Sequence, residues 1–162
     1  MVQEKIDYTF DGEERAKIVR KREAGRVFEY TKALVKRFGP EVLDVLGETS
    51  RELTMKGTEK VLEELNIEER DAIAAVKVLS YFHAITGTSG EVVEATPHRA
   101  VRIERACPCS DVWDHEFCSK VTSVPAIEGM CAAINPKLTF THPKFLNRGD
   151  DRCEMVFELN KK

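Results

Sequence analysis

The chain has 162 residues, of which 42% are hydrophobic and 33% are charged, and its formal net charge is -3. This composition excludes a wholly disordered chain, and the length suits one domain that buries a core without disulfides. The small negative charge gives no electrostatic reason to expect nucleic-acid binding. Because the N-terminus lacks a hydrophobic leader and no apolar run approaches about 18 residues, we expect a cytoplasmic protein with reduced thiols and no membrane segment.

Apolar residues recur at helical spacing throughout the first half of the chain. The spacing predicts helices over most of residues 13–86, the first of them capped by Asp11. A second predicted helix has Gly57 as its point of interruption, and Asn66 is predicted to cap a third. A glycine-containing break then ends this helical part, which we place at about residues 11–87.

From residue 90 onward the apolar residues alternate, which is typical of strands with one buried face. In the second strand, Val101 and Ile103 are assigned to one face, while Arg102 and Glu104 are assigned to the solvent face. The four expected strands lie near residues 91–95, 99–106, 138–142 and 152–159.

Two short helices are expected between the second and third strands, capped by Ser110 and Ser123. The predicted fold is therefore α+β, with N-terminal helices followed by a small four-stranded antiparallel sheet packed against helices. We treat residues 1–162 as one domain, whose cysteine-bearing part covers about residues 90–160.

All five cysteines lie in this second part of the chain. Cys153 shares its strand face with apolar residues, Cys131 lies on the apolar side of a predicted helix, and Cys107 follows a strand. We therefore predict that their three sulfur atoms lie within about 10 Å of one another around one pocket. The alternative is that these thiols only fill space in the core.

Two kinds of chemistry compete with simple packing. A thiolate at Cys107 or Cys109 would be stabilised at a helix N-terminus, with His115, His142 or a nearby aspartate as its base. A zinc ion could instead take its ligands from Cys107, Cys109, Cys118, Cys131 and Cys153, with His115 or His142. Only the first two cysteines are closely spaced, so no cofactor is expected and zinc is the alternative.

Several short motifs carry a resemblance to known families. They are Arg105-Ala106-Cys107-Pro108, Asp111-Val112-Trp113, Asn135-Pro136-Lys137-Leu138 and the segment from Gly149 to Phe157 that contains Cys153. Over about residues 90–160 the chain resembles the L-2-amino-thiazoline-4-carboxylic acid hydrolase-like family. Its C-terminal motif is also similar to that of four-vinyl reductase domains, which are α+β sensors of small hydrophobic ligands.

The resemblance implies a hydrolase that opens a C–N bond in a small cyclic amidine, and it marks three of the cysteines without assigning their roles. For such a reaction we predict Cys107, Cys131 and His142 as catalytic residues, and Trp113 and Cys153 as ligand-binding residues. The second hypothesis is a non-enzymatic sensor domain that binds a small ligand or a metal. A third is a structural or interaction protein that could form a homodimer through its long helices.

Overall fold

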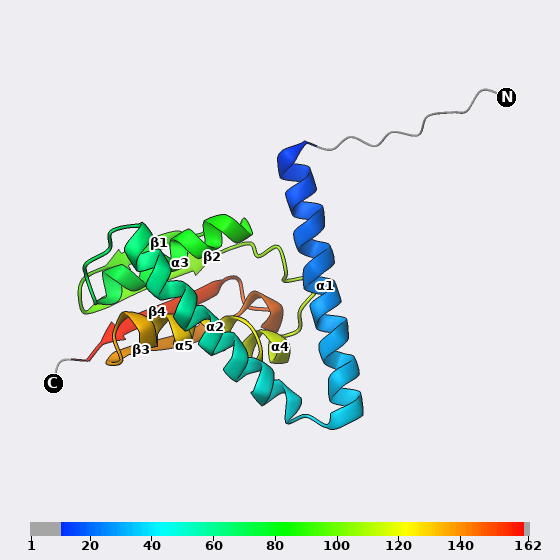
Figure 1. Cartoon of the computed structure of the whole chain (residues 1–162). Coiled ribbons are helices and arrows are strands. Elements are labelled where there is room, and N and C mark those ends of the chain that lie inside the picture. The colour runs from blue at the N-terminus through cyan, green and yellow to red at the C-terminus, as the bar shows by residue number, and fades with distance from the viewer. Residues whose placement is uncertain (1–10, 161–162) are drawn as a thin grey trace.

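The computed structural model describes residues 11–160, which form an α+β fold (Figure 1). The four strands make one antiparallel sheet in the order β1-β2-β4-β3, so the predicted fold class is confirmed. In chain order the elements are α1 (Gly12–Phe38), α2 (Val42–Glu64), α3 (Ala72–Thr86), β1 (Glu91–Ala95), β2 (Arg99–Glu104), α4 (His115–Lys120), α5 (Ser123–Ile134), β3 (Leu138–Lys144), the 3-10 turn η1 (Leu146–Arg148) and β4 (Cys153–Leu159).

The caps of the long helices agree with the sequence prediction only in part. Asp11 caps α1 by accepting a hydrogen bond of 2.8 Å from the backbone N–H of Glu14. α2 continues through Gly57, so the predicted interruption is wrong. The cap of α3 is Asp71, whose carboxylate accepts from two backbone N–H groups of the first turn. Asn66 has a positive φ of 51° and lies in the turn after α2, where it cannot cap α3.

Both serine caps predicted for the short helices are wrong. α4 is capped by Asp114, which accepts from the N–H of Phe117 at 2.8 Å. Ser110 lies in the preceding turn, where its hydroxyl donates to the carbonyl oxygen of Cys107 at 2.9 Å. Ser123 is the first residue of α5 rather than its cap, and no side chain caps that helix.

The structure buries both faces of β2. Val101 and Ile103 are 6% and 7% exposed in a small apolar cluster, but the face predicted to meet solvent is buried too. Arg102 and Glu104, predicted to face solvent, are 5% and 4% exposed. They lie opposite Met155 and Cys153 of β4, on the side of the sheet that packs against the helices. Buried ionic groups survive in a core when each finds a partner, and here they pair with each other and with α3.

The main core lies between the sheet and the helices α3 and α5. At its centre are Phe157 of β4 and Met130 of α5, both almost fully buried. Small residues at the start of α3 and in β2 let the helices approach the sheet closely. The remaining buried members are Val61, Leu62, Ile67, Ala72, Ala74, Ala75, Val76, Val78, Leu79, Ala100, Ile127, Cys131, Ile134, Leu138 and Met155.

Two glycines permit close backbone contact of α2 with α4 and with α5. A Cβ atom at Gly47 would lie 2.2 Å from the carbonyl oxygen of Lys120. A Cβ atom at Gly129 would lie 2.1 Å from the carbonyl oxygen of Arg51. Carbon atoms do not approach backbone oxygens so closely, so each of these two contacts requires glycine.

α1 lies to one side of the sheet and touches the rest of the molecule mainly around α4 (Figure 1). The ring of Phe28 packs edge-on against that of Phe117, with 5.1 Å between the centroids. The indole N–H of Trp113 donates to the carbonyl oxygen of Ala24 at 3.1 Å. α1 is therefore held at one end of the sheet without lying over its core.

Candidate functional site

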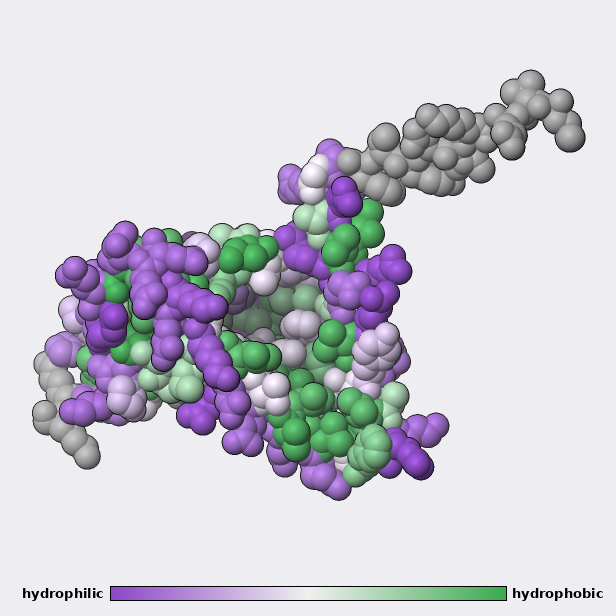
Figure 2. Space-filling view, in the orientation of Figure 1, coloured by the Kyte–Doolittle hydropathy of each residue, from purple (hydrophilic) through white to green (hydrophobic). Residues whose placement is uncertain are grey.

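A cavity of about 710 Å³ lies between α1, α2 and the end of the sheet. Figure 2 shows it as a hollow between α1 and the rest of the molecule. Its volume falls in the range that accommodates drug-sized organic molecules. Apolar and sulfur-containing side chains make up most of its wall: Ala24, Val27, Leu53, Leu79, Phe82, Cys107, Pro108, Cys109, Trp113, Cys118, Ala126, Ile127, Met130, Leu146, Cys153 and Met155.

One part of the wall is a buried ionic group that joins β2 to α3. The carboxylate of Glu104 accepts from Nε of Arg102 at 3.1 Å, and Arg102 also donates to Oγ of Ser80 at 2.9 Å. Nδ1 of His83 contacts the same Glu104 oxygen. Glu104 and His83 both line the cavity, so its apolar surface carries a polar region whose charges are already paired.

His142 lies on β3 and presents unpaired nitrogen atoms to this region. Its ring packs against that of Phe145, with 3.6 Å between centroids, and both ring nitrogens are buried without a protein hydrogen-bond partner. Burial lowers the pKa of His142 to about 4. The ring is therefore neutral at pH 7, with one nitrogen able to donate a hydrogen bond and the other able to accept one.

Other polar atoms in the cavity wall also lack partners within the protein. They include Oγ1 of Thr122 and Oδ1 of Asn147, both buried. Buried polar groups in folded proteins normally form hydrogen bonds, so such atoms concentrated in one cavity point to a polar group supplied from outside the chain.

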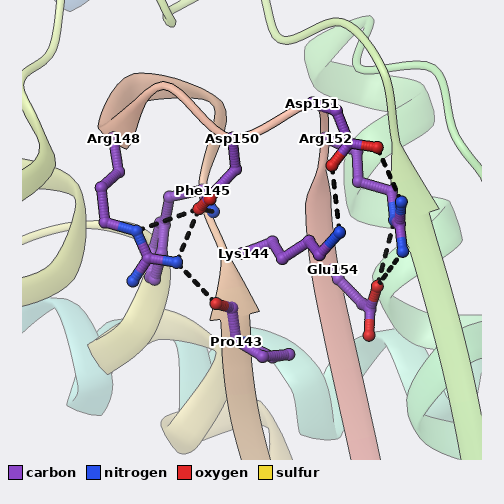
Figure 3. Close-up of polar contacts among 8 residues, drawn as sticks. All are labelled: Pro143, Lys144, Phe145, Arg148, Asp150, Asp151, Arg152 and Glu154. Carbon is purple, nitrogen blue, oxygen red and sulfur yellow. Dashed lines mark hydrogen bonds and ion pairs between the residues drawn. The ribbon is translucent and has the colours of Figure 1, made fainter.

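The turn between β3 and β4 is braced by two sets of polar contacts, which Figure 3 shows. Asp150 accepts from the backbone N–H of Phe145 at 2.8 Å and from Arg148, which also donates to the carbonyl oxygen of Pro143. Beside it, Lys144, Asp151, Arg152 and Glu154 form a chain of ion pairs. These contacts fix η1, which contributes Leu146 and Asn147 to the cavity wall.

Asn147 also connects this turn to the segment before α4. Its side-chain amide donates to the carbonyl oxygen of Asp114 at 3.1 Å. The wall opposite α1 is thus tied together across separate parts of the chain.

The predicted cluster of three thiols forms only in part. Cys107 and Cys153 line the cavity, together with Cys109 and Cys118. Cys131 is 2% exposed in the main core and does not line it. Burial raises the pKa of Cys131 to about 12, so its thiol is protonated and packs as a small apolar group.

The four thiols of the cavity differ in their environments. The thiol of Cys109 hydrogen-bonds to Cys107 and, with the Cys109 backbone N–H at 3.4 Å from Sγ, lowers the pKa of Cys107 to about 7. The same hydrogen bond raises the pKa of Cys109. Burial raises the pKa of Cys118, and it raises that of Cys153 to about 11. Cys107 is therefore the thiol best able to ionise near neutral pH.

The remaining predicted residues have structural partners. Trp113 lines the cavity and also holds α1 through its indole N–H. His115 packs edge-on against Phe145 at 4.7 Å between centroids, outside the cavity lining. Asp111 pairs with Lys21, and Asp114 caps α4, so neither carboxylate is free to serve as a base.

The structure gives no support to the zinc alternative, which stays a prediction. All five cysteines are free thiols. Among residues 11–160, no group of three or more histidine, cysteine, aspartate or glutamate side chains is placed to hold a metal ion.

Neither Glu104 nor His83, which both line the cavity, was identified as a site residue from the sequence. Apolar and charged residues alternate along β2, so the charged residues were assigned to solvent, where such residues ordinarily lie. No local signal in the sequence distinguishes this buried glutamate from a solvated one, because an Arg102–Glu104 pair also suits an exposed strand face and only the fold brings His83 to Glu104.

Comparison with known proteins finds likeness in structure alone, since no family model and no curated protein matches this sequence. A trafficking protein particle complex subunit 3 from Naegleria fowleri, covalently bound to palmitic acid, has a TM-score of 0.63 and 13% identity. The similarity covers 90% of this chain and 97% of that one. The phenol-responsive sensory domain of the transcription activator PoxR, solved with phenol, has a TM-score of 0.64 and 10% identity, covering 93% of this chain and 92% of that one.

At these identities the likeness establishes a shared fold. It names neither the hydrolase-like family nor the four-vinyl reductase domains, so that resemblance stays a prediction. Between residues 11 and 160, no helix has the combination of length and apolar character needed to cross a membrane.

Proposed function

We propose that this chain is a non-enzymatic sensor domain that binds a small organic ligand, largely apolar with one hydrogen-bonding group. The observation that carries this proposal is the cavity of about 710 Å³, whose apolar wall contains buried polar atoms without protein partners. Both structural neighbours were solved with an organic ligand, phenol in one and palmitic acid in the other.

The cavity wall offers hydrogen-bonding partners to a polar group of the ligand. Glu104 is already paired with Arg102, whereas Nε of Arg20, which also lines the cavity, is buried without a hydrogen-bond partner. A neutral His142 can accept a hydrogen bond from a ligand hydroxyl. The apolar body of the ligand would then lie against Leu79, Phe82 and Met155. Alkyl-substituted phenols combine these features, and the cavity has room for their alkyl chains.

Calorimetry with a series of para-alkylphenols tests this proposal. We expect saturable binding that strengthens with chain length, by about 0.8 kcal/mol for each buried methylene. His142→Phe keeps the ring but leaves the ligand hydroxyl unpaired, which should weaken binding about tenfold or more. Ala126→Trp should abolish binding by filling the cavity.

The matched control is Val93→Ser, which changes an exposed residue of β1 away from the cavity and should bind as the wild type does. Absence of saturable binding across the series, or unchanged binding by Ala126→Trp, would reject the proposal.

A hydrolase acting on a small cyclic amidine is the second candidate, and one observation favours it. The pKa of Cys107 is lowered to about 7 inside a cavity that could hold a substrate, as a thiol nucleophile requires. Cys131 lies outside that cavity and would take no part. Turnover of 2-amino-thiazoline-4-carboxylate that is lost in Cys107→Ser would support this candidate, and no turnover by the wild type would reject it.

A further inference from the structure

The cavity wall carries one positive charge that no acidic residue balances. Apart from histidines, its charged side chains are Arg20, Glu23 and Glu104. Glu23 pairs with Arg26 at 3.2 Å. Glu104 pairs with Arg102 at 3.1 Å. Arg20 forms no ion pair within the described part of the chain, and its Nε is buried without a hydrogen-bond partner. The unmatched charge is therefore the guanidinium of Arg20.

The end of α3 sets the position of this guanidinium. A Cβ atom at Gly87 would lie 2.5 Å from Nη1 of Arg20 and 2.6 Å from Nη2, so the guanidinium lies directly against the glycine backbone. Gly87 is the C-cap of α3, where the negative end of the helix dipole favours a cation. The dipole thus holds the guanidinium at the cavity wall, but no acceptor there takes the hydrogen of Nε.

The part of α1 around Arg20 is rich in positive charge. From residue 15 to residue 26, six residues are Lys or Arg and one is Glu. Lys21 pairs with Asp111 and Arg26 pairs with Glu23, and the segment stays positive after both pairs are counted. Such an excess raises the local concentration of anions beside the cavity.

A carboxylate suits this site better than a phosphate. The single unmatched cation balances one negative charge, whereas a phosphate monoester carries about -1.5 to -2 at neutral pH. A second negative charge among apolar side chains would lack a partner, which is costly. The planar fork of a guanidinium also matches the two oxygens of a carboxylate.

From these observations we infer that the ligand is an apolar carboxylic acid whose carboxylate pairs with Arg20. This inference rests on the proposed function and narrows its ligand class. The hydroxyl that His142 can bind and the carboxylate at Arg20 then lie on one apolar body, and hydroxyaryl alkanoic acids combine these three features.

Calorimetry with two matched series of compounds tests the inference. The first series is 4-hydroxyphenyl alkanoic acids of increasing chain length, and the second is their primary amides. At pH 7 the acids are ionised, while each amide has nearly the same size and shape without the charge. At the chain length that binds best, we expect the acid to bind about tenfold more tightly than its amide.

Three variants locate this preference. Arg20→Gln removes the charge, so the ratio of the two affinities should fall to about one. Arg20→Lys keeps the charge without the fork and should retain part of the preference. The matched control is Arg22→Gln, which removes the same charge from an exposed position of α1 outside the cavity wall and should keep the tenfold ratio.

The ratio is taken within each variant, so a general change in affinity cancels. Circular dichroism verifies that the variants are folded, and the partial loss in Arg20→Lys carries the test if Arg20→Gln does not fold.

Equal affinity for acid and amide in the wild type would overturn this inference. A full preference retained in both Arg20 variants, or a preference lost in Arg22→Gln, would overturn it as well. Binding of para-alkylphenols to the same wild-type sample reports separately on the proposed function. Saturable alkylphenol binding without a preference for the acid would reject the carboxylate alone, and no binding of any compound would reject both.

Discussion

The two ends of one sheet face differ sharply in chemistry. At one end Ala100, Phe157 and Leu138 are buried under α3 and α5. Following the same strands to the other end leads to Glu104 on β2, Cys153 on β4 and His142 on β3, all of which line the cavity.

The difference follows from the helices above each end. α3 and α5 approach the sheet closely and fill the space with apolar side chains, whereas α1 lies to the side (Figure 1) and leaves the cavity open. Three strands of one sheet therefore differ between their ends, which suits stability at the packed end and binding at the cavity end. The same measurement made at both ends of the sheet should therefore give different results.

Cysteine reactivity should separate the two ends most strongly. At pH 7 about half of Cys107 is thiolate, while the pKa of Cys131 near 12 leaves almost none. Allowing for the lower intrinsic nucleophilicity of the more acidic thiol, Cys107 should react with iodoacetamide about a few hundredfold faster. Peptide mass spectrometry of timed samples measures both rates.

The alkylation rate of Cys107 should rise with pH around a midpoint near 7 and should rise further only slightly above pH 8. Cys107→Ser serves as the control, since it should remove the fast phase and leave the slow one. Equal rates at the two cysteines would show that the ends do not differ in the way described.

Truncation of side chains should separate the ends in stability. Phe157 is fully buried at the packed end, so Phe157→Ala should lower the free energy of unfolding by about 3–5 kcal/mol. Leu53 lines the cavity and is already 64% exposed, so Leu53→Ala should change it by no more than about 0.5 kcal/mol. Urea unfolding of both variants provides the values, and a large loss in Leu53→Ala would mean that the cavity wall is part of the stabilising core.

Acid should lower the free energy of unfolding through a histidine at the cavity end of the sheet. The pKa of His142 falls from 6.5 in the unfolded chain to about 4 in the folded one, so the unfolded chain binds its proton first as pH falls. The contribution of the neutral ring is complete above about pH 6.5 and is lost as pH falls towards 4. Its size is at most about 3 kcal/mol.

Urea unfolding at pH 7 and pH 4.5 measures this effect as the difference between the wild type and His142→Phe. The wild type should lose more stability than the variant over this range. His98→Gln, which removes an exposed histidine of the β1–β2 turn, should lose as much as the wild type. A His142→Phe variant with the wild-type pH dependence would contradict the buried, neutral state of His142.

The packed end could largely be predicted from the sequence, and the cavity end could not. Alternation in β4 correctly placed Met155 and Phe157 on the core side, and helical spacing placed the long helices. Helical spacing also placed Cys131 correctly on the apolar side of α5. Such spacing predicts which side of a helix is buried, but it does not predict which part of the core that side contacts.

The cavity depends on how far the helices and strands lie from one another. The spacing of apolar residues along the sequence carries no information about those distances. Nothing local in the sequence states that α1 would lie beside the sheet instead of over it. Burial of Arg102 likewise depends on Ser80 and Glu104, and only the fold brings Ser80 near it. Trp113 was a candidate for the cavity wall on residue type, and the structure adds its hydrogen bond to α1.

The glycine contacts of α2 with α4 and α5 also affect how related sequences can diverge. At Gly47 and Gly129 every larger residue would collide with a backbone oxygen, so neither position can change unless the helices move apart. Gly57 in the cavity wall is under no such restriction, since a Cβ atom there would meet nothing within 4 Å. A substitution at Gly57 can therefore alter ligand preference while the helix contacts that support the cavity stay unchanged.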